Sequence, residues 1–142
     1  MLTMYNGKVN SPKTQLDGAI TDSQTTMNVL DASVLPVAPN ICTIGTGDDA
    51  ETVSYSDITG NVVTIARAFE GVAKAWDSGT IVARNFTHYD YDALKDNVGE
   101  LETNQGDLTT LTTTEKSNLV GAINETNNRN RISFINRFSC NR

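Results

Sequence analysis

A change of residue pattern at His88 constrains the fold more than any other feature of this sequence. Between residues 19 and 87, short runs rich in Thr, Val and Ile alternate apolar with polar side chains, and turns separate them roughly every 8–12 residues. After His88, apolar side chains recur at spacings of three and four, as on one face of a helix. The pattern predicts a mainly β chain with C-terminal helices, its β part a small β-barrel or sandwich.

The pattern divides the chain of 142 residues into four parts. We expect a polar N-terminal arm at 1–18, a β-rich module at 19–87, a helical segment at 88–128 and a basic tail at 129–142. Within the module, strands are predicted at 19–21, 25–30, 41–44, 51–58, 62–68 and 80–86, with a hairpin turn at 59–61. The arm has little apolar surface, so it is expected to stay mobile or to lie against another subunit.

The first helix is predicted at 88–104, and its apolar side chains follow a heptad spacing: Leu94, Val98, Leu101 and, seven residues further, Leu108. Gly99 and Gly106 weaken this helix. A long helix with one narrow apolar stripe is marginal alone. Other copies of the same chain would cover the stripe, so we expect self-association through it.

A second helix is predicted at 114–128, and its apolar face holds Leu119, Val120 and Ile123. Thr112 and Glu115 fit a capping box, with Thr112 as the N-cap residue. For the tail beyond residue 128, the pattern leaves a short strand and a docking tail open.

The charge distribution bears on partners. Residues 1–128 carry all 17 acidic side chains and seven basic ones, a net charge of −10, whereas the last fourteen residues carry four arginines and no acid. An acidic body argues against nucleic-acid binding, which needs a basic surface. The basic tail suits an acidic protein surface. No apolar run of about 18 residues predicts a membrane span, and no signal peptide is recognised, so synthesis and folding in a cytoplasm are expected.

Candidates for catalysis are few. His88 is the only histidine, and it lies at the junction of the two halves without a nucleophile motif beside it. Cys42 lies in an apolar run, where thiols are usually inert, and with Cys140 it forms neither a disulfide framework nor a zinc motif. We therefore predict no enzymatic activity and no cofactor.

Acidic side chains near one turn suggest at most a weak calcium site at Asp48, Asp49 and Glu51, and a solvated turn is the preferred interpretation. No metal site is therefore predicted. The hairpin turn instead brings Glu51 close to Arg67 or Glu70, which predicts an exposed ion pair that ties a loop to a strand. Trp76, the only tryptophan, is expected to fill the end of the barrel, with a partner anchor as the alternative.

Residues 25–86 resemble a module found near the start of many fibre, neck and baseplate proteins of tailed phages. The matching stretches are TTMNV at 25–29, ETV at 51–53, GN at 60–61, RAFEGV at 67–72 and GTIV at 79–82. In the fourth stretch, Ala68 stands where the module usually has glycine and Val72 where it usually has threonine. Gly71 matches the module's second glycine. These two departures leave the local turn geometry open.

A second stretch, LTTTEKSNLVGAINE at 111–125, is similar to an element of phage fibres and tail proteins that often adjoins a trimeric coiled coil. Together the two resemblances imply a non-enzymatic virion component, a short fibre or adaptor made in the host bacterial cytoplasm. They imply that a trimer is the usual state. The residues expected to hold the copies together are those of the two apolar faces: Leu94, Val98, Leu101, Leu108, Leu119 and Ile123. The resemblances also imply contacts with portal, capsid, collar or tail proteins. The alternative is a tail protein that binds a host-surface carbohydrate or receptor.

Overall fold

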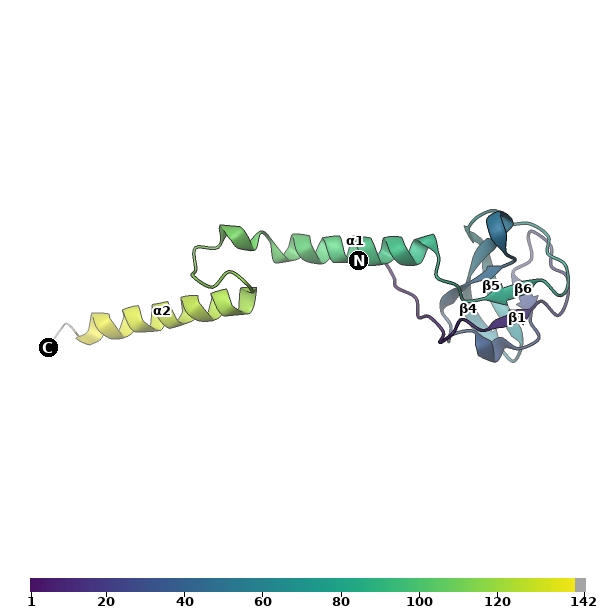
Figure 1. The fold of residues 1–142 in the computed structure, drawn as a ribbon. Coiled ribbons are helices and arrows are strands. Elements are labelled where there is room, and N and C mark those ends of the chain that lie inside the picture. The colour runs from purple at the N-terminus through teal and green to yellow at the C-terminus, as the bar shows by residue number, and fades with distance from the viewer. Residues whose placement is uncertain (140–142) are drawn as a thin grey trace. The chain divides into compact units, whose positions relative to one another are not determined.

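The computed structural model describes the backbone of residues 1–139 and the side chains of residues 1–134. The chain divides into two compact units, one formed by Leu2–Leu94 and one by the residues from Lys95 onward. The first unit holds all the described strands, and the helical segments follow it (Figure 1). The chain is thus mainly β with C-terminal helices, as the pattern change at His88 predicts.

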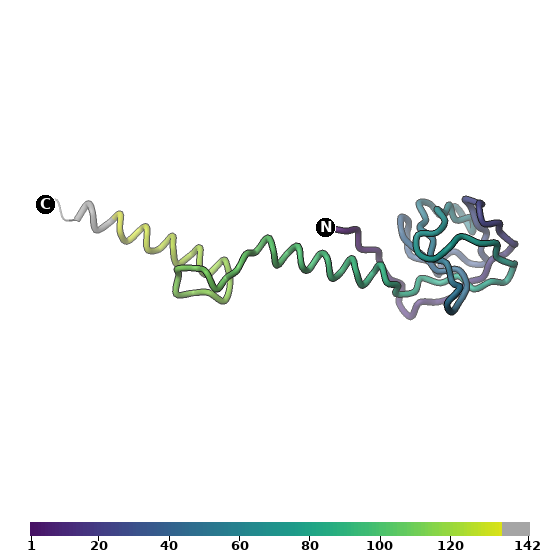
Figure 2. Tube along the Cα trace, turned by 90° about the horizontal axis from the view of Figure 1, so that it is seen from above, coloured from purple at the N-terminus to yellow at the C-terminus, as the bar shows by residue number. Residues whose placement is uncertain are grey.

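One antiparallel sheet makes up the β unit, with the strand order β1-β6-β3-β4-β5-β2. Its strands are β1 (Lys13–Gln15), β2 (Thr26–Asn28), β3 (Asn40–Ile44), β4 (Glu51–Thr59), β5 (Val62–Glu70) and β6 (Ile81–Ala83). A bridge between Leu16, directly after β1, and Val29, directly after β2, joins the two outer edges of the sheet. The sheet therefore curls around its own apolar face, as the Cα trace shows (Figure 2).

Alternation along the strands places the core on the inside of this curl. In β5, Val63 and Ile65 are buried, while Val62 and Thr64 between and beside them are exposed. Tyr55 is the largest fully buried side chain of β4, and its hydroxyl donates to the Pro36 carbonyl at 2.8 Å. Such a satisfied hydroxyl lets a polar ring end lie in an apolar core.

Five of the predicted strands are present with bounds shifted by a few residues, and the 59–61 hairpin turn joins β4 to β5. The candidate strand at 19–21 is reduced to a single bridge between Ile20 and Trp76. The predicted boundary at residue 18 is wrong, because β1 lies before it and Leu16 is buried in the core. The N-terminal residues also contact their own β unit, rather than remaining free.

The first helix, α1, spans His88–Gln105, one residue longer than predicted. Gly106, with a φ of 75°, ends it. Leu108 then starts a short 3-10 helix, Leu108–Thr110, so the heptad spacing does not continue through Leu108 on one helix. Of the predicted stripe, α1 therefore carries only Leu94, Val98 and Leu101. We call these three residues the α1 stripe.

The second helix, α2, spans Leu119–Ser139. It starts five residues later than predicted and continues through the region for which a strand or a docking tail was expected. The predicted capping box is not formed: Asn118 accepts a 2.7 Å hydrogen bond from the Gly121 amide and acts as the cap. Arg129 and Arg131 of the basic tail lie on this helix, whereas Cys140 and Arg142 lie outside the described residues.

Neither described helix combines the length with the apolar character that crossing a lipid bilayer requires.

Candidate functional site

Glu51 is the centre of a buried polar cluster in the β unit. Its side chain is fully buried at the start of β4, where Arg67 of β5 donates to both carboxylate oxygens, at 2.9 Å from Nε and 2.7 Å from Nη2. The Ala68 amide donates to Oε1 at 2.9 Å and the Trp76 indole N–H to Oε2 at 3.0 Å. We call these groups the Glu51 cluster. Its four donors satisfy the carboxylate without water.

The predicted Glu51–Arg67 ion pair is formed in the interior of the β unit and not on its surface. The two residues do pair, but the Arg67 side chain is only 8% exposed and that of Glu51 not at all, so the expectation of an exposed pair is wrong. Burial alone raises the pKa of Glu51, but the bonds from Arg67, Trp76 and Ala68 outweigh it and leave the pKa below its ordinary value. A buried pair with every hydrogen bond made fixes geometry more strictly than an exposed one.

Trp76 closes one side of this cluster. Its ring packs partly against the apolar core, as expected from its preferred role, and Lys74 Nζ lies 4.4 Å from the ring centroid. A Cβ at Gly45, whose φ is 82°, would lie 2.4 Å from the ring. Glycine at that position is what allows the ring to approach the sheet.

Backbone geometry explains the residue types at two positions of the RAFEGV stretch, Ala68 and Gly71. Ala68 has a φ of 54°, in the left-handed region where the resembling module carries glycine. Gly71 has a φ of 82°, and a Cβ there would lie 2.8 Å from the Ala50 carbonyl oxygen. Glu70 does not join Glu51 but accepts a 2.8 Å hydrogen bond from the Tyr89 amide in the first turn of α1.

A second buried pair, which the sequence reasoning missed, joins Arg84 after β6 to Asp90 in α1. Arg84 Nη1 and Nη2 lie 2.8 and 2.6 Å from the two Asp90 oxygens, and both side chains are at most 8% exposed. Asp90 also accepts a 2.9 Å bond from the Thr87 amide. Thr87 and Asp90 have the S/T-x-x-D spacing related to a capping box, which was the available signal.

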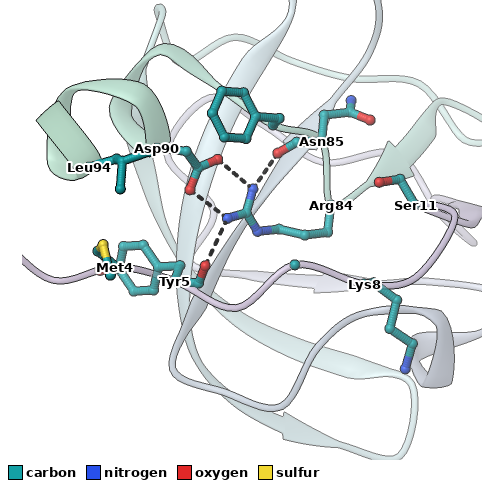
Figure 3. A pocket seen from close by; sticks show the side chains of 10 residues that line it. Met4, Tyr5, Lys8, Ser11, Arg84, Asn85, Asp90 and Leu94 are labelled. Atoms are coloured by element: carbon teal, nitrogen blue, oxygen red, sulfur yellow. Dashed lines mark hydrogen bonds and ion pairs between the residues drawn. The ribbon is translucent and has the colours of Figure 1, made fainter.

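Arg84 lies at the floor of a shallow hollow in the β unit (Figure 3). Met4, Phe86 and Leu94 give the hollow exposed apolar rims, with Phe86 74% exposed. Burial raises the pKa of Asp90, but the bonds from Arg84 and Thr87 more than offset this and lower it below the usual value. The Arg84 guanidinium is committed to protein oxygens, so its own charge is not available to a ligand in the hollow.

The residues predicted for self-association are mostly exposed. On α1, Leu94 is 50%, Val98 45% and Leu101 54% exposed, whereas Ala93 is buried. On α2, Leu119 and Ile123 are 41% and 51% exposed. Each helix therefore has apolar side chains that its own chain leaves in contact with solvent.

Within the helical unit, the loop before α2 is fastened to that helix. Glu125 accepts hydrogen bonds from the Thr114 and Glu115 amides at 3.1 and 2.9 Å. Thr113 is buried and donates to the Glu115 carbonyl at 2.7 Å, and Ala122 of α2 is buried as well. The TTTE and AINE ends of the second resemblance thus meet in space.

The candidates for chemistry are separated. Cys42 is buried, and burial raises the pKa of its thiol to about 12, so it is protonated at neutral pH. The His88 side chain is exposed and lies 3.1 Å from Asp92 of the same helix. Glu51 faces Arg67 rather than Asp48 and Asp49, and within the described residues no three potential metal ligands converge.

Comparison of the chain with protein-family models and with curated protein sequences gives no match.

Proposed function

We propose that this chain is a non-enzymatic structural component of a tailed-phage virion, a short fibre or adaptor that anchors to the head, neck or tail and assembles with copies of itself. The observation that carries the proposal is the exposed α1 stripe, Leu94, Val98 and Leu101, on a helix that continues from a β unit. The two resemblances in the sequence supply the phage context.

Helix energetics favour self-association. An isolated helix of this length is marginal in water, and most helical stability in proteins comes from burying an apolar face. Leu94 and Leu101 are seven residues apart with Val98 between them, the spacing of a coiled-coil seam. Identical helices would bury these three side chains against one another, and a trimer is the state that the resemblance favours.

The polar chemistry of the β unit favours a structural role. Glu51 and Asp90 each bind an arginine, and among the described residues every buried side-chain nitrogen or oxygen has a hydrogen-bond partner. Catalytic sites commonly keep such groups available to a substrate, whereas here they fix one part of the chain to another. Other virion proteins, such as portal, capsid, collar or tail proteins, are the proposed partners of the β unit.

The first test is the mass of the purified chain in solution by light scattering. We expect three copies for the natural sequence and one for a variant with Leu94→Asp and Leu101→Asp. Thr103→Asp with Asn104→Asp is the matched control, since it adds the same charge at exposed polar positions of α1. A double leucine variant that remains assembled would refute the α1 stripe as the interface.

The second test addresses the virion. Particles assembled with a gold-labelled chain should carry label at a fixed position on the head, neck or tail in electron micrographs. Label that is absent from purified particles contradicts the structural proposal. A chain that binds host cells or glycans without being part of the particle would support the alternative of a host-surface binder, which the exposed Phe86 and Tyr91 rings favour.

A further inference from the structure

The N-terminal residues 2–11, called the strap, are held on the β unit through their main chain. Hydrogen bonds reach the strap from Tyr89 Oη to the Thr3 carbonyl (2.8 Å), from Arg84 Nη2 to that of Tyr5 (3.4 Å), and from Arg84 Nε and Asn40 Nδ2 to that of Asn6 (3.2 and 3.1 Å). Figure 3 shows the strap passing beside Arg84. We call Asn40, Arg84, Tyr89 and Phe69 the strap slot.

Few side chains of the strap contribute to this binding. Tyr5 packs on Phe69 and Tyr89, with ring centroids 6.1 and 5.6 Å away. Met4 and Val9 instead are 60% and 84% exposed. The slot therefore recognises a main chain carrying one aromatic ring, and any copy of the strap satisfies it equally.

The slot also requires an occupant. Arg84 is only 4% exposed, and the Asn6 carbonyl accepts from both its Nε and the buried Asn40 amide. Without a strap, Asn40 Nδ2 would lose this acceptor, and Arg84 Nε would keep only the Asn40 Oδ1 oxygen at 3.0 Å. Leaving a buried donor without its acceptor is costly. A slot of this kind remains filled, either by its own strap or by that of another copy.

The connection from the strap to β1 is strained. Asn10 and Ser11 have φ values of 63° and 40°, so two successive residues other than glycine adopt the left-handed region directly before Pro12. The Ser11 amide donates to the Lys8 carbonyl at 3.0 Å, which closes a tight reversal. Short strained hinges favour the exchange of a terminal segment between copies, because exchange allows the hinge to extend.

We propose that in the assembled protein the straps are exchanged, so that residues 3–8 of one copy occupy the strap slot of a second copy. All the slot's hydrogen bonds are kept in the exchanged form, whereas the left-handed hinge opens. The inference rests on the proposed self-association, which supplies the neighbouring copy at high local concentration. Exchange would link the β units of the assembly in addition to the α1 stripe.

Cross-linking between two distinguishable chains tests the exchange. Lys8 Nζ lies 2.9 Å from the Ser33 carbonyl and both residues are exposed, so cysteines at these positions suit a short bismaleimide. One chain carries Lys8→Cys and the other Ser33→Cys with a C-terminal affinity tag. Both carry Cys140→Ser, and the buried Cys42 is left in place. The two are co-expressed and treated after purification of the assembled form.

We expect a product that contains one chain of each kind, and less of it when Asn10→Gly and Ser11→Gly relieve the hinge. The double variant Lys8→Cys with Ser33→Cys shows that the reagent spans the pair. If the protein is assembled but the two singly substituted chains do not cross-link, and the Lys8→Cys, Ser33→Cys double variant reacts only within single chains, the exchange is overturned. The proposed function is then unaffected. A chain that is monomeric by light scattering overturns both.

Discussion

Glu51 is a charged side chain without exposed surface, and the stability of the β unit depends on its carboxylate remaining ionised. Its pKa and that of Asp90 are lowered in the folded state, so the unfolded chain takes up protons first as the pH falls. The stabilisation is complete above the unfolded pKa of about 4 and is lost as the pH falls through the lowered folded values. We expect the free energy of unfolding to decrease steeply below about pH 4.

Glu51→Gln should weaken this pH dependence and destabilise the β unit at neutral pH. It leaves the Arg67 charge buried without a counter-charge, which costs roughly 3–5 kcal/mol. Urea unfolding followed by Trp76 fluorescence at pH 7 and at pH 3 measures both effects. Asp22→Asn is the matched control, because Asp22 is exposed. Equal losses in the two variants would contradict the role assigned to the cluster.

Ala68 gives a second prediction at the residue scale. Its left-handed φ of 54° costs about 1–2 kcal/mol in any residue with a Cβ. Glycine removes that strain but adds about 0.4–1 kcal/mol of unfolded-state entropy. Ala68→Gly should thus leave stability unchanged or raise it by up to about 1.6 kcal/mol. Ala66→Gly, two residues earlier in β5, should instead lower it by about 0.5–1 kcal/mol. The same urea titration compares them, and equal effects would contradict the strain.

At the scale of elements, the loop before α2 depends on Glu125 more than on a capping box. We expect Glu125→Ala to release the Thr114 and Glu115 amides, since both donate to its carboxylate. Amide hydrogen exchange at these two residues should become faster, while the Gly121 amide stays protected by Asn118. Asn124→Ala is the neighbouring control. Unchanged exchange at Thr114 would show that the loop is held by something else.

The elements also show what a sequence pattern can predict. Alternation of apolar and polar side chains marked the long strands β4 and β5. In β5 burial alternates in the same way, whereas the first three residues of β4 are all buried. β1 was missed because a three-residue strand with one buried side chain, Thr14, is too short to show a period. The α2 start was misplaced because Thr112 and Glu115 match a capping box that the folded loop does not use.

For the candidate sites, the sequence predicted contacts between neighbouring strands but not contacts between distant segments. The Glu51–Arg67 pair followed from one hairpin, since β4 and β5 are adjacent in sequence and in space. Its burial depends on Trp76, which reaches the cluster from a loop far along the chain. The strap slot combines Asn40, Arg84 and Tyr89 from three separate segments, and no local pattern records such a combination.

At the scale of the whole molecule, the two units should respond differently to protein concentration. The β unit has its own core, so its unfolding should not depend on concentration if the straps stay in their own chains. The helical unit leaves its apolar side chains exposed, so copies that bury them stabilise it by mass action. Helical unfolding should therefore shift to higher temperature as the concentration rises.

Thermal unfolding at two concentrations a hundredfold apart separates these effects. Circular dichroism at the helical wavelength follows α1 and α2, whereas Trp76 fluorescence follows the β unit, because Trp76 is the chain's only tryptophan. We expect the helical midpoint to rise with concentration in the natural chain and to become constant in Leu94→Asp with Leu101→Asp. A Trp76 midpoint that also rises, and becomes constant when residues 2–11 are deleted, would indicate exchanged straps that join the β units. If neither midpoint depends on concentration, the chain folds as a monomer and the exposed α1 stripe has another partner.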